Sequence, residues 1–217
     1  KTVEGAVGGT LFADGKCNPA NGFEKLRHYA LNPDVTLPAE AIIPVFRSDG
    51  SGTTFVFTDY LTKVSPMWKE KFGAGKSVNF PSGQAAKGNP GVAGVISNTR
   101  FSIGYVGSEY AFAQKIPYAR IKNTKGEFVL PSSTTISAAA SGVIPTDTRC
   151  SITNADAAGA YPISTFTWLI IYKEQNYSDR SKEQAEATID LLKYILSAQV
   201  QNMTSEVNYA PLPAKAR

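Results

Sequence analysis

The stretch Pro44–Phe55, with the sequence PVFRSDGSGTTF, predicts both the architecture of this chain and its chemistry. A short apolar segment ends at Arg47, a Ser/Gly loop follows, and a helical pattern of apolar residues begins after the loop. A strand that passes through a tight loop into a helix is the basic unit of an α/β fold. Such a loop leaves backbone N–H groups without partners at the helix N-terminus, where the helix dipole adds partial positive charge. The stretch therefore predicts an anion-binding loop.

The side chains of the loop fit the same chemistry. Arg47 supplies a planar fork that matches two oxygens of an oxyanion, and Ser51 and Thr53 supply hydroxyl donors. Asp49 either orients Arg47 or accepts a proton that the ligand still carries. The same spacing also fits an ordinary capped helix after a glycine turn, with a surface pair of Arg47 and Asp49. Both interpretations remain open on spacing alone.

Motifs for other chemistries are missing. The loop lacks the Gly-Lys-Ser/Thr of a Walker A motif, and DGSGT is not the Gly-x-Ser-x-Gly elbow of a hydrolase. Glu109 and Tyr105 are candidates for an acid/base pair, but no second carboxylate or nucleophile joins them in a recognisable motif. The single histidine, His28, excludes a multi-histidine metal site and a histidine-based triad. We therefore predict a protein that is not an enzyme and that uses no cofactor.

Helical and strand patterns alternate along the rest of the chain, which indicates the α/β class. The helical patterns are at residues 23–31, 53–72 with a break at Pro66, 90–97, 108–114, 132–140 and 181–201. The strand patterns are at residues 41–46, 102–106, 119–122, 127–130 and 166–172, the last being the strongest. Ser181 with Gln184 predicts a capping box, and Trp68 and Trp168 are expected to be core aromatics.

Composition excludes several classes of protein. The chain has 217 residues, 42% of them hydrophobic and 18% charged, and a net charge of +4. Its basic residues form no cluster, so nucleic acid is not an expected partner. No apolar run approaches the roughly 18 residues that span a bilayer. Cys17 and Cys150 could form one disulfide or remain two buried thiols. The chain starts at Lys1 with no signal peptide, as a processed mature protein or a fragment of a longer chain would.

The segment Arg47–Leu61, RSDGSGTTFVFTDYL, resembles the phosphate-binding loop of the substrate-binding proteins of phosphate ABC transporters. Further similar motifs follow in the right order, at Lys87–Ala93, Ser102–Val106 and Tyr161–Trp168, so that the resemblance covers residues 30–213. It implies an α/β fold, a periplasmic-binding-protein-like lobe of type II with a mixed sheet flanked by helices. It also implies that the phosphate-binding residues are those of the second lobe, here Arg47, Asp49, Ser51, Gly52 and Thr53.

The departures from the family pattern concern its first lobe. The Gly-rich and acidic motifs that complete the phosphate cage are missing, and Val3–Phe12 shows only a faint likeness to them. We therefore expect an N-terminal segment of unclear role at residues 1–25. Residues 26–217 are expected to form one phosphate-binding-protein-like lobe with its hinge crossings and a C-terminal helix.

The resemblance implies noncovalent binding of inorganic phosphate, as part of a phosphate-uptake binding protein in the periplasm or outside the cell. A complementary first-lobe chain or domain is expected to complete the site, and an ABC transporter permease is a further partner. The alternative is that the lobe serves as a structural or self-assembling subunit of an extracellular complex or filament. An enzyme built on this scaffold, such as a phosphatase, is the third reading.

Overall fold

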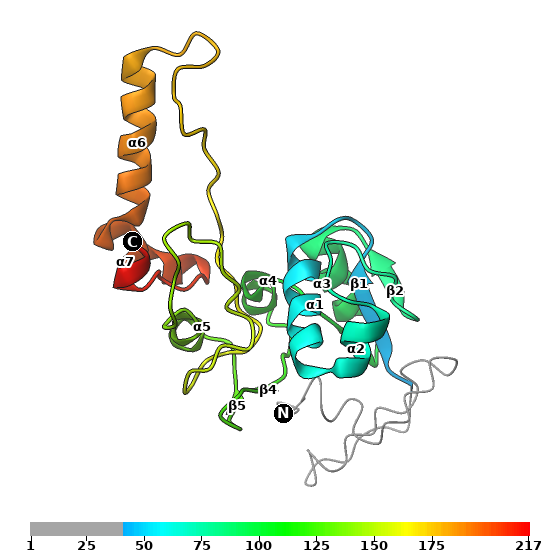
Figure 1. The fold of residues 1–217 in the computed structure, drawn as a ribbon. Coiled ribbons are helices and arrows are strands. Elements are labelled where there is room, and N and C mark those ends of the chain that lie inside the picture. Colours follow the sequence, from blue (N-terminus) through cyan, green and yellow to red (C-terminus); the bar gives the residue numbers. More distant parts are fainter. Residues whose placement is uncertain (1–40) are drawn as a thin grey trace.

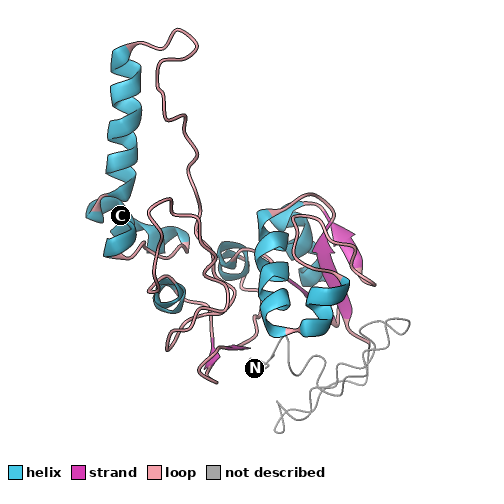
Figure 2. Ribbon diagram, in the orientation of Figure 1, coloured by secondary structure: helices cyan, strands magenta, loops and turns pink. Residues whose placement is uncertain are grey.

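A three-stranded parallel sheet holds the segment that the sequence singled out (Figures 1 and 2). The computed structural model describes residues 41–217, and β1 (Ile43–Arg47) lies at the centre of this sheet. On one side of it is β2 (Gln84–Ala86), and on the other is β3 (Ser102–Gly104). Both neighbours run parallel to β1, so the carboxyl ends of the three strands meet at one edge.

Helices account for most of the remaining regular structure in the described residues. The helices are α1 (Gly52–Val64), α2 (Pro66–Lys71), α3 (Gly88–Asn98), α4 (Ser108–Ala113), α5 (Ser133–Ala139), α6 (Lys182–Leu196) and α7 (Ala198–Met203), followed by 3-10 turns η1 (Thr204–Val207) and η2 (Ala214–Ala216). The predicted break at Pro66 is confirmed: Ser65 ends α1 and caps α2, with Pro66 at the first position of α2. The predicted capping box of Ser181 and Gln184 at the start of α6 is also confirmed.

The core lies on both faces of the parallel sheet. Val45 of β1 packs with Val92 of α3 on one face. The ring of Phe46 stacks on Phe80 at 4.7 Å between centroids, and Phe80 in turn contacts Trp68 of α2. Successive side chains of a strand point to opposite faces, so β1 has packing partners on both faces. This arrangement fixes the position of the residue that ends the strand, Arg47.

The α/β class is confirmed, with two differences in the sheets. The predicted strands at 119–122 and 127–130 form an antiparallel hairpin of β4 (Ile121–Lys122) and β5 (Phe128–Val129). This hairpin is separate from the parallel sheet. The described strands therefore do not form the single mixed sheet that the resemblance implied. Strand β2 was not predicted, because the three residues between Gly83 and Lys87 are too few to show an alternating strand pattern. The pattern at 102–106 predicts a short buried strand, whereas Ile103 of β3 is 48% exposed at the edge of the sheet.

The strongest strand prediction, residues 166–172, is wrong. Figure 2 shows the chain between α5 and α6 entirely as loop, and no described residue pairs with this segment. The segment leads away from the sheet, turns, and returns as α6 (Figure 1). Trp168, expected in the core, is 46% exposed, whereas Trp68 is 2% exposed as predicted. Strand propensity is expressed only when neighbouring strands supply hydrogen-bonding partners.

Several predictions fall on residues outside the described range. They include the helix at 23–31, His28, and the segment 1–25. The choice between a disulfide and two thiols also involves such a residue, Cys17, while Cys150 itself is half-buried beside Ile152. Over residues 41–217, no helix is both long enough and apolar enough to span a membrane. In the same range, no group of three or more potential metal-ligating side chains comes together.

A polar cluster ties α1 to the loop around residues 151–153. Asp59 Oδ2 accepts hydrogen bonds from Ser151 Oγ at 2.6 Å and Thr153 Oγ1 at 2.5 Å, and Lys63 Nζ lies 3.1 Å away. Partial burial raises the pKa of the Asp59 carboxyl, but the hydrogen bonds from Ser151, Thr153 and Lys63 outweigh it and leave this pKa below its usual value. The ionised carboxylate is therefore the form that the fold stabilises.

We expect Asp59→Asn to lower the free energy of unfolding by about 1–2 kcal/mol at pH 7, because charge-assisted hydrogen bonds are replaced by neutral ones. A carboxyl with a lowered pKa in the folded state contributes stability above its unfolded pKa, and that stability disappears as the pH falls through the folded pKa. The variant should therefore approach the unchanged protein in stability as the pH falls through the lowered pKa of the folded state, as measured by urea unfolding. Asp156→Asn is the control, because its ion pair with Lys125 is exposed. Equal losses for both variants at pH 7 would contradict the role given to the cluster.

Candidate functional site

The predicted loop lies at the carboxyl edge of the parallel sheet, where two helices begin. Arg47 ends β1 and α1 starts five residues later, at Gly52. The register places Arg47 opposite Ala86 at the end of β2, which brings the start of α3 beside the loop. Crevices at the carboxyl ends of parallel strands are where α/β proteins bind ligands. Two helix N-termini with their partial positive charge therefore converge on this edge.

Arg47 and Asp49 form a two-pronged ion pair. Arg47 Nε donates to Asp49 Oδ1 at 2.8 Å, and Nη2 donates to Oδ2 at 2.5 Å. The backbone N–H of Gly88 donates to the same Oδ1 at 2.9 Å. The hydrogen bond from Arg47, followed by that from Gly88, holds the pKa of the Asp49 carboxyl well below its usual value, and the bond to Asp49 raises the pKa of Arg47. Of the two predicted roles of Asp49, orienting Arg47 is the one that these contacts support.

The start of α1 leaves two backbone donors available. Ser51 is the N-cap, and its Oγ accepts from the N–H of Thr54 at 3.2 Å. The N–H of Ser51 itself donates to the carbonyl of Lys76 at 2.8 Å. Within residues 41–217, only the N–H groups of Gly52 and Thr53 remain without a hydrogen-bond acceptor in the loop Ser51–Thr54. Fewer N–H groups are therefore available to an anion than the sequence predicted, and the buried Ser51 acts mainly as the N-cap of α1.

Asn89 joins the two halves of the loop and was missed from the predicted site. Its Oδ1 accepts from Arg47 Nη1 at 3.0 Å and from Thr53 Oγ1 at 3.4 Å. Asn89 is the second residue of α3 and follows Gly88, whose φ of +68° favours glycine. The residue lies 42 positions from Arg47 in sequence. Asn89 follows β2, a strand parallel to β1, at the start of the next helix. This position at the carboxyl edge of the sheet is the signal that could have identified Asn89.

Tyr105 buttresses the loop from the opposite side. Its hydroxyl lies 2.7 Å from Thr54 Oγ1 and accepts from the backbone N–H of Arg47 at 3.2 Å. Its ring stacks on Phe57 of α1 at 4.5 Å. The acid/base pair considered for Tyr105 and Glu109 receives no support from these contacts, because the Tyr105 hydroxyl hydrogen bonds with Arg47 and Thr54 and not with Glu109. Tyr105 therefore holds the strand end and the helix start together.

These contacts define what the site can do. Arg47 uses three of its N–H groups on Asp49 and Asn89, which leaves two of its five for a ligand. The Arg47 side chain is only 11% exposed, whereas Gly52 is exposed and Thr53 half-buried. An oriented cation beside two available backbone N–H groups is a binding arrangement for an oxyanion. The capped helix and the Arg–Asp pair of the alternative interpretation are also present, and they are what hold this arrangement in place.

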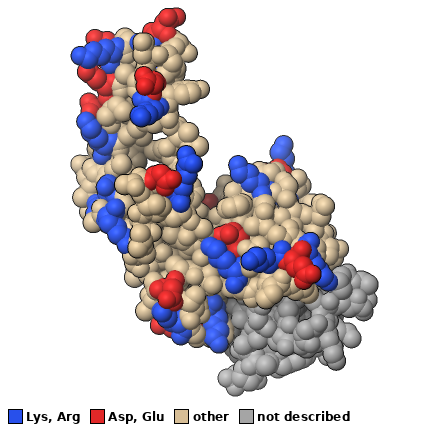
Figure 3. Space-filling model, viewed as in Figure 1, with Lys and Arg blue, Asp and Glu red and all other residues tan. Residues whose placement is uncertain are grey.

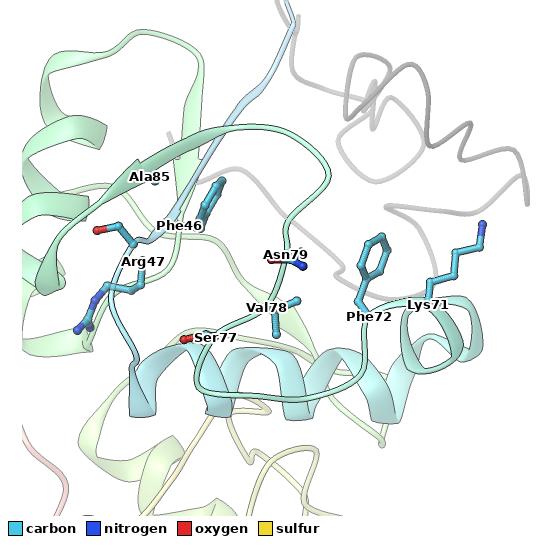
Figure 4. A pocket seen from close by; sticks show the side chains of 9 residues that line it. Phe46, Arg47, Lys71, Phe72, Ser77, Val78, Asn79 and Ala85 are labelled. Atoms are coloured by element: carbon cyan, nitrogen blue, oxygen red, sulfur yellow. The ribbon is translucent and has the colours of Figure 1, made fainter.

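A cavity of about 550 Å³ lies on the other side of the loop and is distinct from this arrangement (Figure 4). It is lined by Phe46, Arg47, Ser48, Lys71, Phe72, Ser77, Val78, Asn79 and Ala85. Figure 4 shows the Arg47 side chain pointing away from Phe72 and Lys71. The guanidinium hydrogen bonds with Asp49 and Asn89, so the cationic group is directed to the carboxyl edge of the sheet rather than into this cavity.

Comparison with known proteins identifies the class of protein to which this fold and this edge site belong. The family model described as the PBP superfamily domain matches residues 24–199. The chain belongs to this family. It is 42% identical over 183 residues to the phosphate-binding protein PstS of Methanocaldococcus jannaschii, and 38% identical over 208 residues to that of Xylella fastidiosa. These matches confirm the resemblance to phosphate-binding proteins that the motifs predicted.

The matches also show how much of each relative is represented. They cover 77% and 94% of this chain, but only 47% of the M. jannaschii protein and 56% of the X. fastidiosa protein. The chain thus spans about half the length of these relatives. Among solved structures, a high affinity periplasmic phosphate-binding protein bound with phosphate matches with a TM-score of 0.52 at 22% identity, over 81% of this chain and 55% of that one. That structure supports the fold.

Proposed function

We propose that the loop Arg47–Thr53 binds inorganic phosphate noncovalently and without chemical turnover. Two oxygens of the anion accept hydrogen bonds from the backbone N–H groups of Gly52 and Thr53, and Arg47 supplies the positive charge and its two remaining N–H groups. The observation that carries the proposal is the fixed guanidinium of Arg47 beside these two available N–H groups. Both relatives described above are phosphate-binding proteins, which supports phosphate as the anion.

Asp49 contributes to the choice between phosphate and sulfate. Its lowered pKa keeps the carboxyl ionised, and an ionised carboxylate only accepts hydrogen bonds. Hydrogen phosphate carries a proton that it can donate to such an acceptor, whereas sulfate at neutral pH carries none. Sulfate has no proton to donate, so its oxygens and those of Asp49 would face one another as acceptors only, and we propose that the loop prefers the protonated anion.

The loop supplies only one side of an enclosing site, and we propose that a complementary lobe supplies the other. Gly52 and Phe55 are exposed beside the loop, with 44% of Phe55 accessible, so an anion bound here remains open to solvent. The chain spans about half of its relatives, which leaves them enough additional chain for a second lobe. With both lobes closed over phosphate, the protein would serve phosphate uptake in the periplasm or outside the cell, together with an ABC transporter permease.

The proposal is tested by titrating the ¹⁵N-labelled chain with phosphate and, separately, with sulfate, and by following its amide resonances. We expect the largest shifts at Gly52 and Thr53, whose N–H groups are available, and smaller shifts at Ser51 and Thr54, whose N–H groups already have acceptors. Phosphate should produce these shifts at lower concentration than sulfate. If phosphate moved other amides and left Gly52 and Thr53 unchanged, the anion would bind elsewhere and the proposal would fail.

An assembly subunit is the second candidate function, and the exposed apolar residues of the segment 166–172 favour it. A chain with that function would associate with copies of itself whether or not phosphate is present. Light scattering of the chain at micromolar concentration distinguishes the two functions. A stable oligomer without any response of Gly52 and Thr53 to phosphate would favour assembly, whereas a monomer that responds to phosphate would favour binding.

Asn89→Asp is expected to weaken phosphate binding by roughly 10- to 100-fold, because it places a second negative charge beside the anion. The new carboxylate oxygen can still accept from Arg47 and Thr53, so the geometry is kept while the charge changes. The measurement is the phosphate titration of both proteins. Asn98→Asp, the same change at the far end of α3, is the matched control and should leave the affinity unchanged. An equal effect of the two substitutions would contradict the position given to Asn89.

A further inference from the structure

The bond between Asp49 and Gly50 lies inside the loop and joins two residues that can react with each other. In an Asp-Gly pair, the amide nitrogen of the glycine can attack Cγ of the aspartate, because glycine has no Cβ to hinder the approach. The sequence contains one other such pair, Asp14–Gly15. Gly50 is exposed, so water reaches this part of the loop. The loop therefore holds both reacting groups beside the solvent.

The reaction between the two residues passes through a succinimide ring. A bond forms between the nitrogen of Gly50 and Cγ of Asp49, while one Cγ–O bond breaks. The amide hydrogen and the carboxyl OH leave together as water. Hydrolysis returns one water to either carbonyl carbon of the ring. Attack at the main-chain carbonyl carbon leaves isoaspartate, in which the main chain runs through the former side chain of Asp49. The net reaction is an isomerisation that leaves the mass unchanged.

The nitrogen of Gly50 is free to react. Within residues 41–217, the N–H of Gly50 has no hydrogen-bond acceptor. The φ of Gly50 lies outside the left-handed region, in contrast to that of Gly88. A Cβ added at position 50 would meet Ser77 Oγ at 3.7 Å as its nearest neighbour, which is an ordinary contact distance. Neither the backbone nor the packing requires glycine here, so alanine at this position is a usable test of the reaction.

The carboxyl of Asp49 is the reacting group that the fold holds back. Arg47 donates to both of its oxygens, and the N–H of Gly88 donates to Oδ1 at 2.9 Å. The hydrogen bond from Arg47, followed by that from Gly88, keeps the pKa of this carboxyl well below its usual range. A carboxylate is a poor electrophile, and its oxygen leaves as water only after it has been protonated. These hydrogen bonds therefore oppose ring closure.

The ion pair of Arg47 and Asp49 is more sheltered than most ion pairs of the described residues. Figure 3 shows charged side chains of both signs on the surface, and a pair such as Lys125–Asp156 is exposed at both ends. Exposed pairs open readily to water and contribute little. The Arg47 side chain is only 11% exposed, and the sheet fixes its position at the end of β1. The guanidinium therefore stays on the carboxyl of Asp49.

We propose that Asp49–Gly50 is a latent site of isoaspartate formation and that the ion pair with Arg47 prevents the reaction in the folded protein. Arg47 thus has a second role, which goes beyond anion binding and does not depend on it. Isoaspartate would add one carbon to the main chain between β1 and α1. That change would displace the N-cap Ser51 relative to the end of the strand, so the loop would lose its geometry.

The test is to incubate the folded chain and its variants at neutral pH without phosphate and to measure isoaspartate at position 49. Peptide mapping by mass spectrometry, with fragmentation that distinguishes isoaspartate from aspartate, gives the rate. Arg47→Ala should form isoaspartate roughly 10- to 100-fold faster than the unchanged protein, because the charged hydrogen bonds to the carboxyl are lost. Arg47→Lys keeps the charge without the fork and should be intermediate. Arg149→Ala is the matched control, because it removes an arginine from the exposed pair with Asp147, and it should leave the rate unchanged.

Two further measurements establish which reaction is observed. In urea, Asp49 and Asp14 of the unchanged chain should form isoaspartate at equal rates, which gives the rate without protection by the fold. Adding Gly50→Ala to Arg47→Ala should slow the reaction severalfold, because the Cβ hinders the attacking nitrogen. Peptide mapping also separates position 49 from Asn21–Gly22, which yields isoaspartate by loss of ammonia. Circular dichroism shows that each variant is folded before the incubation begins.

Three outcomes would overturn the inference: the folded unchanged protein reacts as fast as the chain in urea, the folded Arg47 variants react as slowly as the unchanged protein, or Arg149→Ala accelerates the reaction as much as they do. If Arg47→Ala does not fold, the comparison of Arg47→Lys with the unchanged protein decides. The phosphate titration of Gly52 and Thr53 is independent of these rates. Its failure would refute the proposed function and leave this inference standing.

Discussion

Replacing Arg47 with alanine is expected to weaken phosphate binding by roughly 30- to 900-fold, which corresponds to about 2–4 kcal/mol. Two effects add to this loss. The anion loses its charged hydrogen-bond donor, and Asp49 loses the guanidinium that donates to both of its oxygens, at 2.8 and 2.5 Å. Only the N–H of Gly88 would still donate to Asp49. The substitution would therefore change the charge at the site from balanced to negative.

Arg47→Lys separates the charge from the shape of the side chain. Lysine keeps the positive charge but cannot donate simultaneously to both oxygens of Asp49 and to Asn89 with the fixed fork of arginine. We expect a loss of roughly tenfold, smaller than that for alanine. Calorimetry with phosphate, carried out on all three proteins, measures the difference. If lysine and alanine caused the same loss, the fork geometry would carry the binding, and if alanine caused none, Arg47 would not contact the anion.

The local part of the site could be predicted because it depends on residues that are close in sequence. The apolar residues before Arg47 form β1, and Ser51 caps α1 with the side-chain geometry that a serine N-cap adopts. The break at Pro66 follows from the missing N–H of proline. Each of these features needs information from only a few neighbouring residues, and each is found where the sequence placed it.

The parts that were missed depend on which strands lie next to one another. Asn89 reaches Arg47 because Ala86 of β2 is in register with Arg47, and Tyr105 reaches Thr54 because β3 lies on the other side of β1. Strand order and register cannot be read from the local pattern of either segment. The segment 166–172 shows the converse case: its pattern is that of a strand, but the described chain supplies no neighbour with which it could pair.

The two readings of the loop, a capped helix and an anion site, turn out to be compatible. The cap of Ser51 uses the N–H of Thr54, and the carbonyl of Lys76 uses the N–H of Ser51. Without these contacts the donors would compete for the same anion in several geometries. With them, two adjacent N–H groups remain at a fixed position beside Arg47. Structural contacts of this kind are what preorganisation of a binding site consists of.

Trp68→Ala is expected to lower the free energy of unfolding by about 3–5 kcal/mol, a large part of the stability of an ordinary domain. Trp68 is 2% exposed, lies 4.7 Å from Phe72 and 5.8 Å from Phe80 between ring centroids, and donates from Nε1 to the carbonyl of Gly73 at 2.9 Å. Alanine would leave a cavity and remove the donor to Gly73. Urea unfolding followed by circular dichroism measures the change.

Trp168→Ala is the matched control, because it makes the same replacement at a position that is 46% exposed, and it should change the stability by no more than about 0.5 kcal/mol. The effect of Trp68→Ala should also extend to the phosphate loop. The segment 73–80, which Trp68 holds through Gly73 and Phe80, supplies the carbonyl of Lys76 that accepts from the N–H of Ser51. Loosening this segment releases the loop in which Gly52 and Thr53 are fixed, so phosphate affinity should fall although Trp68 never contacts the anion. Trp68→Phe, which keeps an aromatic ring but lacks the indole donor, should lose less stability and less phosphate affinity than Trp68→Ala. If Trp68→Ala reduced stability while the folded protein bound phosphate as tightly as before, the core and the loop would be independent.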